Sequence, residues 1–339
     1  MKNISGNALV IKEVNTNLVL KVLREKGKAT KQEISKITGL STVTIGSILQ
    51  HLMRANEVIE GELSASQGGR PAKQFSYNYQ CNFILILLPY EKEGAIYMRC
   101  TIADLLGKAI CENDEKIEQI DVSCLESFIS HYIELYPEIN AVGIGLPSVE
   151  TEGKIIISDY KKLIGLSISS YFKDLYHIPI KVENDVNAAA SGFMQKEKRE
   201  SECTMAYLYF PDQYPPGAGL FINGKLYKGK SNFAGEVNAL PLGIKWNKSL
   251  YDDFDNWCEA IAKLIMVLCS ILNPHYIVLT SDKLNDAHIH TVKKRCLREL
   301  EKDVLPEIML SNDFIKDYQE GLIRETLIAL EPDIALTKK

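Results

Sequence analysis

Residues 41–50 combine hydroxyl, amide and small side chains and contain no carboxylate. Hydroxyl and amide groups can form hydrogen bonds to base edges and phosphates, and a side chain such as Val43 can contact the methyl group of thymine. Without a carboxylate, the segment carries no charge that would repel phosphates. This composition predicts a surface that contacts DNA through the candidate residues Ser41, Thr42, Val43, Thr44, Gly46, Ser47 and Gln50.

A second group of candidate DNA contacts is Gly68, Gly69 and Arg70, which Pro71 follows. Glycines let a backbone come close to a groove, and arginine suits the negative potential of a narrow minor groove. A solvated turn with an incidental arginine would explain this loop equally well when it is considered alone. Together with residues 41–50, the loop favours contact with DNA.

Three helices and a hairpin are expected to position these residues. Apolar spacing predicts a first helix over about residues 15–26, and a capping box of Thr30 and Glu33 predicts the start of a second. A third helix carries the first group of candidates. Strands are expected at residues 58–62 and 73–77. Two helices joined by a tight turn and followed by a hairpin predict a winged helix-turn-helix.

Gly46 is an unusual residue for the middle of the third helix, because glycine costs about 1 kcal/mol relative to alanine there. Two explanations stay open. The helix comes close to a base pair or phosphate at this point, or it packs tightly against another helix.

The charge distribution separates this head from the rest of the 339-residue chain. Residues 1–80 contain 11 Lys and Arg against 6 Asp and Glu, a balance of +5. Residues 81–339 contain 28 against 38, a balance of −10. A small basic head on a large acidic body favours a polyanionic partner for the head, although random drift gives the same pattern.

The acidic body alternates short apolar strands with longer helical segments, which predicts an α/β architecture. Residues 83–108 and 205–225 share a strand-turn-strand plan, which predicts a duplicated lobe. The strands are expected at residues 83–88, 96–102, 141–146, 178–182, 205–209, 219–222 and 277–279, and the helices at 124–135, 167–175, 254–272 and 290–304.

Several classes of protein are disfavoured. The longest apolar runs, such as residues 83–88, are far shorter than the roughly 20 residues that span a bilayer. The N-terminal residues resemble no secretory signal, so we expect a cytoplasmic protein without membrane contact. The eight cysteines are scattered without a C-x-x-C pair, which argues against a disulfide framework or a cysteine zinc site.

Four short segments of the head form a recognisable set. They are Glu33-Ile34-Ser35, Thr38-Gly39-Leu40-Ser41, Thr44-Ile45 and Gly68-Gly69-Arg70-Pro71-Ala72. The stretch from Asn17 to Tyr77 thereby resembles the DNA-binding head of ROK-family repressors, whose members respond to sugars such as xylose or N-acetylglucosamine. The family usually carries a longer basic residue near Ser47, so the resemblance does not give the operator sequence.

The resemblance continues through the body, so it is nearly full length. The E-N-D-x-N-A-A-A segment is the most specific match. The segments that carry it are Gly143 to Pro147, Glu183 to Ala190, Gly217 to Leu226, Ala234 to Val237 and Leu272 to Leu279. This resemblance implies a two-lobed body of the actin or sugar-kinase type, which is ribonuclease-H-like.

The resemblance also implies roles for three body residues. In the family's kinases, the aspartate at the position of Asp185 is the general base for the sugar hydroxyl, and residues at the positions of Asn184 and Glu236 contact sugar hydroxyls. A carboxylate within reach of an attacking hydroxyl can take its proton. These three residues are the candidate effector-binding residues.

The chain departs from the family's kinases where they hold ATP. The D-x-G-G-T loop is replaced by residues 87–94, which contain two glutamates and a proline. Such a segment cannot offer phosphates the same open backbone cradle, and phosphoryl transfer depends on that positioning. We therefore expect no kinase activity and no catalytic residues.

The family's zinc element is also altered. Asn238-Ala239 stands where the family has G-H, and the cysteine-rich segment that normally follows is missing. We expect no metal and no cofactor. Asn184, Asp185 and Glu236 then either line an altered pocket for a different small molecule or are relics held by local hydrogen bonds. An altered or absent ligand is slightly favoured over ordinary sugar sensing.

These observations predict an α/β protein with a winged helix-turn-helix domain at residues 1–80 and a degenerate ROK-type domain at 81–339. The favoured function is a DNA-binding transcriptional regulator, a repressor of carbohydrate-related genes that binds a double-stranded operator as a homodimer or higher homo-oligomer. Its effector would be a sugar or another small molecule. The alternatives are a ROK sugar kinase with an appended head, and a module whose head binds protein.

Overall fold

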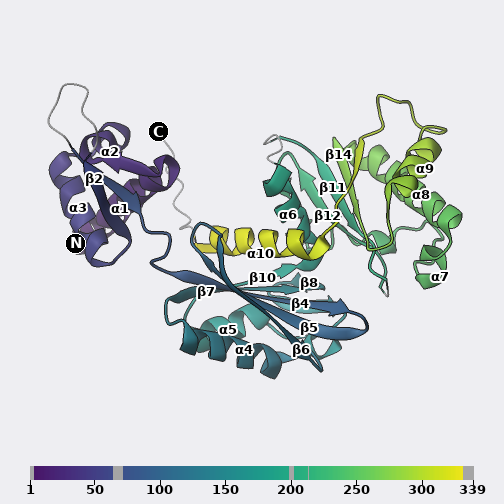
Figure 1. Cartoon of the computed structure of the whole chain (residues 1–339), viewed down its shortest axis with the longest axis horizontal. Helices are drawn as coiled ribbons and strands as arrows, with labels where there is room; N and C mark the ends of the chain where they lie inside the picture. Colours follow the sequence, from purple (N-terminus) through teal and green to yellow (C-terminus); the bar gives the residue numbers. More distant parts are fainter. Residues whose placement is uncertain (1–3, 64–71, 198–201, 213, 331–339) are drawn as a thin grey trace. The chain divides into compact units, whose positions relative to one another are not determined.

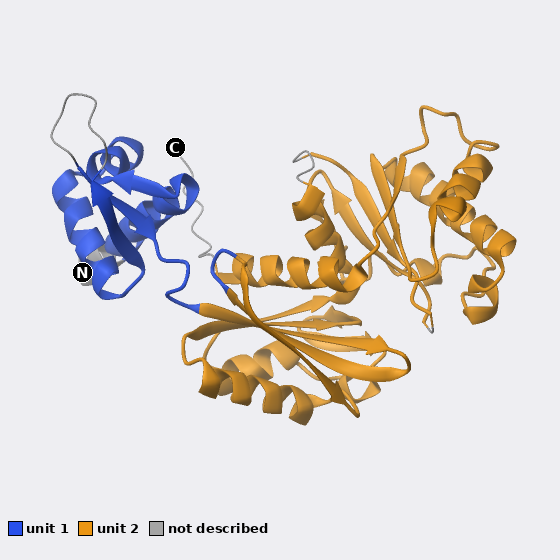
Figure 2. Ribbon diagram, in the orientation of Figure 1, with its two compact units in different colours: residues 1–82, 104–106, 332–339 blue, residues 83–103, 107–331 orange. Residues whose placement is uncertain are grey.

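The computed structural model describes residues 4–63, 72–197, 202–212 and 214–330, with side chains from residue 10 onward. The chain divides into two compact units (Figure 2). Unit 1 comprises residues 1–82, 104–106 and 332–339, and unit 2 comprises residues 83–103 and 107–331.

Unit 1 consists of three helices and a three-stranded antiparallel sheet in the order β1-β3-β2 (Figure 1). Its helices are α1 (Ile4–Lys26), α2 (Lys31–Thr38) and α3 (Thr42–Arg54), and its strands are β1 (Lys28–Thr30), β2 (Val58–Leu63) and β3 (Lys73–Tyr77). Helix α1 begins well before the expected residue 15. The three-residue strand β1 was not expected, because it is too short to show a periodic pattern.

The helix starts in unit 1 follow the expected caps. The Thr30 side chain accepts a hydrogen bond from Glu33 N, and the Glu33 carboxylate accepts one from Thr30 N, so the capping box is confirmed. Gly39 ends α2 in the left-handed conformation, with φ of 74°. The apolar faces of the helices meet the sheet in one core, which includes Leu23, Ile34, Leu49 and Phe75.

The first sheet of unit 2 has the strand order β10-β7-β4-β5-β6, with β4, β7 and β10 parallel (Figure 1). Its strands are β4 (Phe83–Lys92), β5 (Ala95–Asp104), β6 (Ala109–Ile117), β7 (Ile139–Leu146) and β10 (Ile180–Asn184). Helices α4 (Val122–Leu135) and α5 (Ile168–Tyr176) pack on it, and a small hairpin of β8 (Ser148–Thr151) and β9 (Lys154–Ser158) is followed by η1 (Lys161–Leu163).

The second sheet has the order β13-β12-β11-β14-β15. Its strands are β11 (Met205–Tyr209), β12 (Gly217–Ile222), β13 (Lys225–Leu226), β14 (Tyr276–Thr280) and β15 (Glu307–Leu310). Counted from its own first strand, each sheet has the order 3-2-1-4-5, which confirms the expected duplication.

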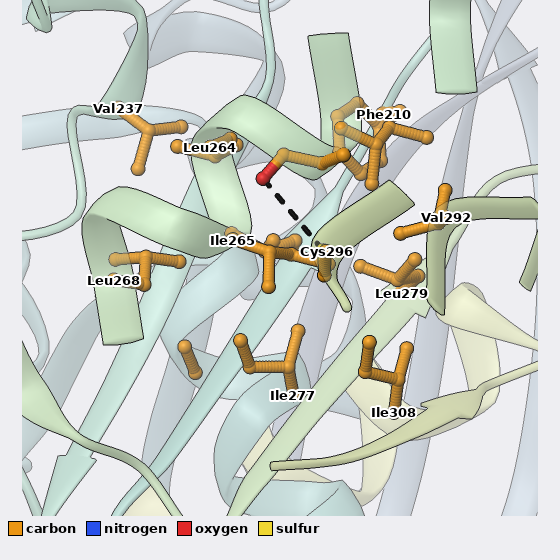
Figure 3. Packing of buried hydrophobic residues seen from close by; sticks show 14 of the residues in the cluster. Phe210, Val237, Leu264, Ile265, Leu268, Ile277, Leu279, Val292, Cys296 and Ile308 are labelled. Carbon is orange, nitrogen blue, oxygen red and sulfur yellow. Dashed lines mark hydrogen bonds between the residues drawn. The ribbon is translucent and has the colours of Figure 1, made fainter. Parts of the chain in front are cut away.

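Helices α8 (Phe254–Leu272) and α9 (Asp286–Cys296) cover the second sheet, and the short elements η2 (Val237–Ala239) and α7 (Lys248–Tyr251) precede them. Figure 3 shows their shared core, where Leu264 and Ile265 of α8 pack with Ile277 of β14. The Cys296 thiol points to Ala262 O at 3.9 Å. The expected helix at residues 290–304 is wrong beyond Cys296, because turns there let Leu300 and Leu305 pack against this core.

Two helices that the sequence did not reveal cross at the centre of unit 2. They are α6 (Asp185–Glu197), which packs on β11 and β12, and α10 (Phe314–Leu330), which packs on β4 and β7 (Figure 1). Gly192 of α6 and Gly321 of α10 lie at the crossing, where a Cβ on Gly321 would overlap Ala188 O. A Cβ on Gly145 of β7 would likewise overlap the Tyr318 hydroxyl. The glycines of these segments therefore allow close packing of backbone.

All eight cysteines are free thiols, and most of them are buried. Within the described residues, no helix is both long and apolar enough to cross a membrane.

Candidate functional site

The face of α3 that does not enter the core carries the first group of sequence-predicted residues. Ile45, Ile48, Leu49 and Leu52 point into the core of unit 1. Thr42, Ser47 and Gln50 are exposed, and Val43 is 82% exposed. The outward side chains of α3 between Thr42 and Gln50 are therefore not used by the core of unit 1.

Two of the predicted contact residues have a structural role. Ser41 caps α3, because its hydroxyl oxygen lies 3.0 Å from Thr44 N and accepts its hydrogen bond. The two side-chain hydroxyls of Ser41 and Thr44 also lie 2.8 Å apart. These hydroxyls fix the start of the helix, and they retain lone pairs toward solvent.

The structure decides between the two explanations for Gly46. A Cβ placed on Gly46 would meet only Lys31 Nζ, at 3.6 Å, which is ordinary contact with the end of a flexible side chain. Tight helix packing therefore does not require this glycine. Close approach of an external partner is the explanation that stays open.

Lys31 is a candidate that the sequence interpretation missed. It is the first residue of α2, it is exposed, and its Nζ lies beside Gly46 and 5.7 Å from the Phe75 ring centroid. The neighbouring carboxylate, Glu33, is held by Thr30, and those hydrogen bonds lower its pKa. Lys31 thus adds a positive charge next to the neutral surface of α3. In the sequence, the position of Lys31 directly after the helix cap Thr30 was the signal that could have identified it as a candidate.

Gly68, Gly69 and Arg70 lie outside the described residues, so their part in this surface stays a prediction.

Unit 2 contains a cavity of about 740 Å³, and all three candidate effector-binding residues line it. Asn184 ends β10, Asp185 begins α6 and Glu236 precedes η2. The end of a parallel strand and the start of a helix thereby bring together residues that are 52 positions apart in sequence.

Local hydrogen bonds hold one of the three residues. Asn184 Oδ1 accepts from Asn187 N at 3.0 Å, and Asn184 Nδ2 donates to Ser148 O at 3.3 Å. The Asp185 carboxylate accepts hydrogen bonds from backbone N–H groups, its own and that of Val186. Glu236 differs, because no described residue forms a hydrogen bond or an ion pair with its carboxylate. The interpretation of the segment as a relic held by local hydrogen bonds therefore fits Asn184, and in part Asp185, better than Glu236.

A third carboxylate, Asp159, lines the same cavity and was missed because it lies in no motif. Burial raises the pKa of Asp185 to about 7, and the charges of Asp159 and Glu236 add to the rise. Burial also raises the pKa of Glu236, and the charge of Asp159 adds to this rise. Burial raises the pKa of Asp159, and the charge of Lys161 opposes that rise. The cavity thus gathers carboxylates whose charged forms are disfavoured by their surroundings.

In this chain, the segment at the position where the family's kinases hold phosphates is part of a hairpin. Residues 87–92 belong to β4, and Glu93 and Gly94 form the turn to β5 with φ of 52° and 75°. Glu91 accepts a hydrogen bond from the Tyr214 hydroxyl at 2.9 Å. The backbone of this segment is used by the sheet, and a carboxylate stands where phosphates would need donors.

No cluster of three or more His, Cys, Asp or Glu in the described part of the chain has a geometry that could hold a metal ion.

Comparison with known proteins places these features in a family. Residues 94–243 match the model of the ROK family. The chain carries a ROK family domain. This region contains the G-I-G-L-P, E-N-D-V-N-A-A-A and A-G-E-V segments that position the cavity residues.

Among curated relatives, a xylose repressor of Bacillus spizizenii is 24% identical over 291 residues, which cover 83% of this chain and 74% of the repressor. Among solved structures, a ROK family transcriptional regulator that is a homologue of the E. coli MLC protein superposes with a TM-score of 0.66 at 16% identity. That match covers 94% of this chain and 99% of the other.

A putative N-acetylmannosamine kinase from Listeria monocytogenes superposes with a TM-score of 0.58 at 13% identity, over 71% of this chain and 97% of the kinase. Both superpositions show the fold, which is the α/β fold of ROK regulators and sugar kinases.

Proposed function

We propose that this protein is a DNA-binding transcriptional repressor of carbohydrate-related genes, with an effector cavity in its body and without kinase activity. Residues 1–80 serve as a winged helix-turn-helix domain, and residues 81–339 serve in dimerisation and effector binding. Two heads of a homodimer bind symmetric half-sites about one helical turn, or a multiple of it, apart. The protein acts in the cytoplasm.

The observation that carries the proposal is the exposed face of α3. From Thr42 to Gln50 its exposed side chains are neutral, Gly46 is not required by internal packing, and Lys31 stands beside it. A small, neutral helix surface next to a cation suits entry into a major groove, where phosphates flank the base edges. The similarity to a xylose repressor over 83% of the chain supports the same function.

The second candidate, a sugar kinase with an appended head, has one observation in its favour. Asp185 lines the cavity and begins a helix, as a general base for a sugar hydroxyl would. Two observations count against it. Residues 87–92 are a sheet strand, and the cavity lining there carries Glu91, Glu93 and Asp212 against a single lysine, Lys92. Phosphoryl transfer needs positioned cations and open backbone donors around the phosphates.

The test is a fluorescence anisotropy titration of the purified full chain with labelled DNA from upstream of its own gene, at two salt concentrations. We expect saturable binding that survives unlabelled competitor DNA and weakens steeply with salt, because phosphate contacts release counterions. Arg70→Ala should weaken this binding if the loop between β2 and β3 contributes. Lack of any binding at low salt would refute the repressor function.

A coupled assay for ADP release, with a panel of hexoses, distinguishes the kinase from the repressor. We expect no sugar-dependent turnover above the background of Asp185→Asn. Turnover that depends on both sugar and Asp185 would replace the proposal with the kinase.

A further inference from the structure

The effector cavity carries a strong excess of negative charge. Seven carboxylates and one lysine, Lys92, line it among the described residues. Two of the acids have partners of their own. Asp212 pairs with Lys283 at 3.5 Å, and Glu91 accepts the Tyr214 hydroxyl. The seven acids are Glu91, Glu93, Asp159, Asp185, Asp212, Glu236 and Asp282.

The protein itself does not fully neutralise Asp159, Asp185 and Glu236. Within the described chain no Lys or Arg forms an ion pair with any of the three. Lys161 Nζ donates to Ser158 O at 3.1 Å, and its charge offsets only part of the rise in the pKa of Asp159. Asp159 is exposed, and Asp185 and Glu236 are half-buried. Like charges that gather in one partly shielded cavity repel one another, and a positive charge among them would remove this repulsion.

The lysines of a neighbouring cavity already form ion pairs of their own. Lys181 and Lys228 line a smaller neighbouring cavity of about 170 Å³, and both pair with the buried Glu183. A second carboxylate, Glu150, lines the same smaller cavity, and both lysine charges oppose the rise in its pKa. Two lysines thus face two carboxylates there, so they do not compensate the three acids.

Aromatic rings form much of the remaining wall. Tyr209 and Phe314 stack with their ring centroids 3.6 Å apart, and both line the cavity. Tyr160, Phe210 and Tyr214 line it as well. Faces of aromatic rings attract cations and also pack against the apolar faces of small organic molecules.

Two polar atoms of the wall lack partners. Tyr318 is 1% exposed and Asn187 is 5% exposed, yet neither the Tyr318 hydroxyl nor Asn187 Oδ1 has a hydrogen-bond partner among the described residues. Both residues line the cavity. A carbonyl oxygen can only accept a hydrogen bond, so Asn187 Oδ1 suits a ligand with N–H or O–H groups. Buried polar groups without partners are uncommon and point to a ligand that satisfies them.

We propose that the cavity binds a small organic cation, a ligand with a protonated amine that sits among Asp159, Asp185 and Glu236 against the aromatic wall. This proposal depends on the proposed function in one respect, which is that the cation is the effector of the repressor. A neutral sugar would satisfy the hydrogen bonds but would leave the three carboxylates without a counter-charge.

Isothermal titration calorimetry of the full chain with matched probes tests this inference. Glucosamine is compared with glucose, and spermidine with triethylene glycol, at pH 7.5 and low salt. In at least one pair we expect the cation to bind at least tenfold more tightly than its neutral partner. Equal affinities within both pairs, or no binding by either cation, would overturn the proposal.

Two variants link the binding to the acids. Asp185→Asn and Glu236→Gln should each weaken the binding of the preferred cation at least tenfold and leave the neutral partner unchanged. Asp174→Asn is the matched control, because Asp174 is exposed on α5 and lies outside the cavity lining. Intrinsic tryptophan fluorescence confirms that each variant is folded. Folded variants that keep the cation affinity would also refute the proposal.

The DNA titration separates this proposal from the function on which it rests. Amine-selective binding by a chain that binds no DNA would support the cavity assignment and refute the repressor. Operator binding by a chain that shows no preference for amines would do the reverse.

Discussion

The exposed face of α3 and the cavity of unit 2 differ in the charge of the side chains that form them. The α3 face has no carboxylate, and Lys31 stands beside it. Among the described residues, seven carboxylates and one lysine line the cavity. Two such surfaces in one chain favour partners of opposite charge, as the two proposals require.

Helix α3 and the crossing helices α6 and α10 of unit 2 also differ in how they use glycine. Gly46 on α3 has space around it, whereas Gly321 on α10 has none. A glycine that its own fold does not require indicates an external constraint, and a glycine that the fold does require indicates packing. The contrast gives four predictions, in which each region is altered and the other serves as the reference.

The largest effect is expected for Gly321→Ala. The added Cβ would overlap Ala188 O, which belongs to the backbone of α6 and cannot rotate away. Overpacking of this kind costs about 1–3 kcal/mol, and more where the backbone must move. Both tryptophans, Trp246 and Trp257, lie in unit 2, so urea unfolding followed by their fluorescence reports on the body. An unchanged midpoint would mean that the α6–α10 crossing is looser than described.

The next effect concerns charge on α3. Ser47→Glu places a carboxylate on the exposed face, and we expect DNA binding at least tenfold weaker at low salt because the new charge faces phosphates. Ser47→Gln is the matched control, because it adds a similar volume without charge. Equal affinities of the two variants in anisotropy titrations would show that this face does not meet DNA.

A corresponding change in the cavity should act through pH. The folded-state pKa of Asp185 is about 7, above its value near 3.9 in the unfolded chain. The folded state therefore holds the proton more tightly, and the contribution of Asp185 to stability falls as pH rises through about 4 to 7. Asp185→Asn removes this dependence, so its gain in stability over the wild type should grow with pH.

The measurement is the thermal unfolding midpoint of the body at pH 5 and pH 8. We expect the difference between variant and wild type to increase by roughly 2–4 °C, which corresponds to ~1 kcal/mol for a domain of this size. The neighbouring charges that act on Asp185 are Asp159 and Glu236, so Asp159→Asn should reduce the effect. A constant difference would mean that Asp185 is already ionised at pH 5.

Local rules predicted much of the fold. The capping box at Thr30, the cap at Ser41 and the apolar face of α3 depend only on neighbours in sequence, and the structure has all three. The duplicated strand order was also visible, as an echo between two short segments. Helix α10 was not visible in the sequence, because Gly321 in its middle weakens the local helical pattern. Only the crossing with α6 explains this glycine.

The candidate site divides in the same way. Asn184, Asp185 and Glu236 were identified through motifs, and the cavity contains all three. Asp159 and Tyr318 were missed, because they follow β9 and lie on α10, where no motif marks them and only the fold brings them to the cavity. The charge of the cavity is therefore a property of the folded chain and is not visible in any one segment.

The smallest effect, and the most direct test of the contrast between the two glycines, is expected for Gly46→Ala. The added Cβ meets only Lys31 Nζ at 3.6 Å, so α3 should gain about 0.8–1 kcal/mol of local stability from its higher helix propensity. Hydrogen exchange of the α3 amides measures this gain. If a DNA partner comes close to Gly46, the same variant should bind operator DNA more weakly despite its more stable helix, because the methyl group occupies the contact surface. A stabilised helix with unchanged affinity would mean that the partner keeps its distance at this position. A more stable α3 together with weaker DNA binding would explain why a glycine that the fold does not need stands on the exposed face of α3.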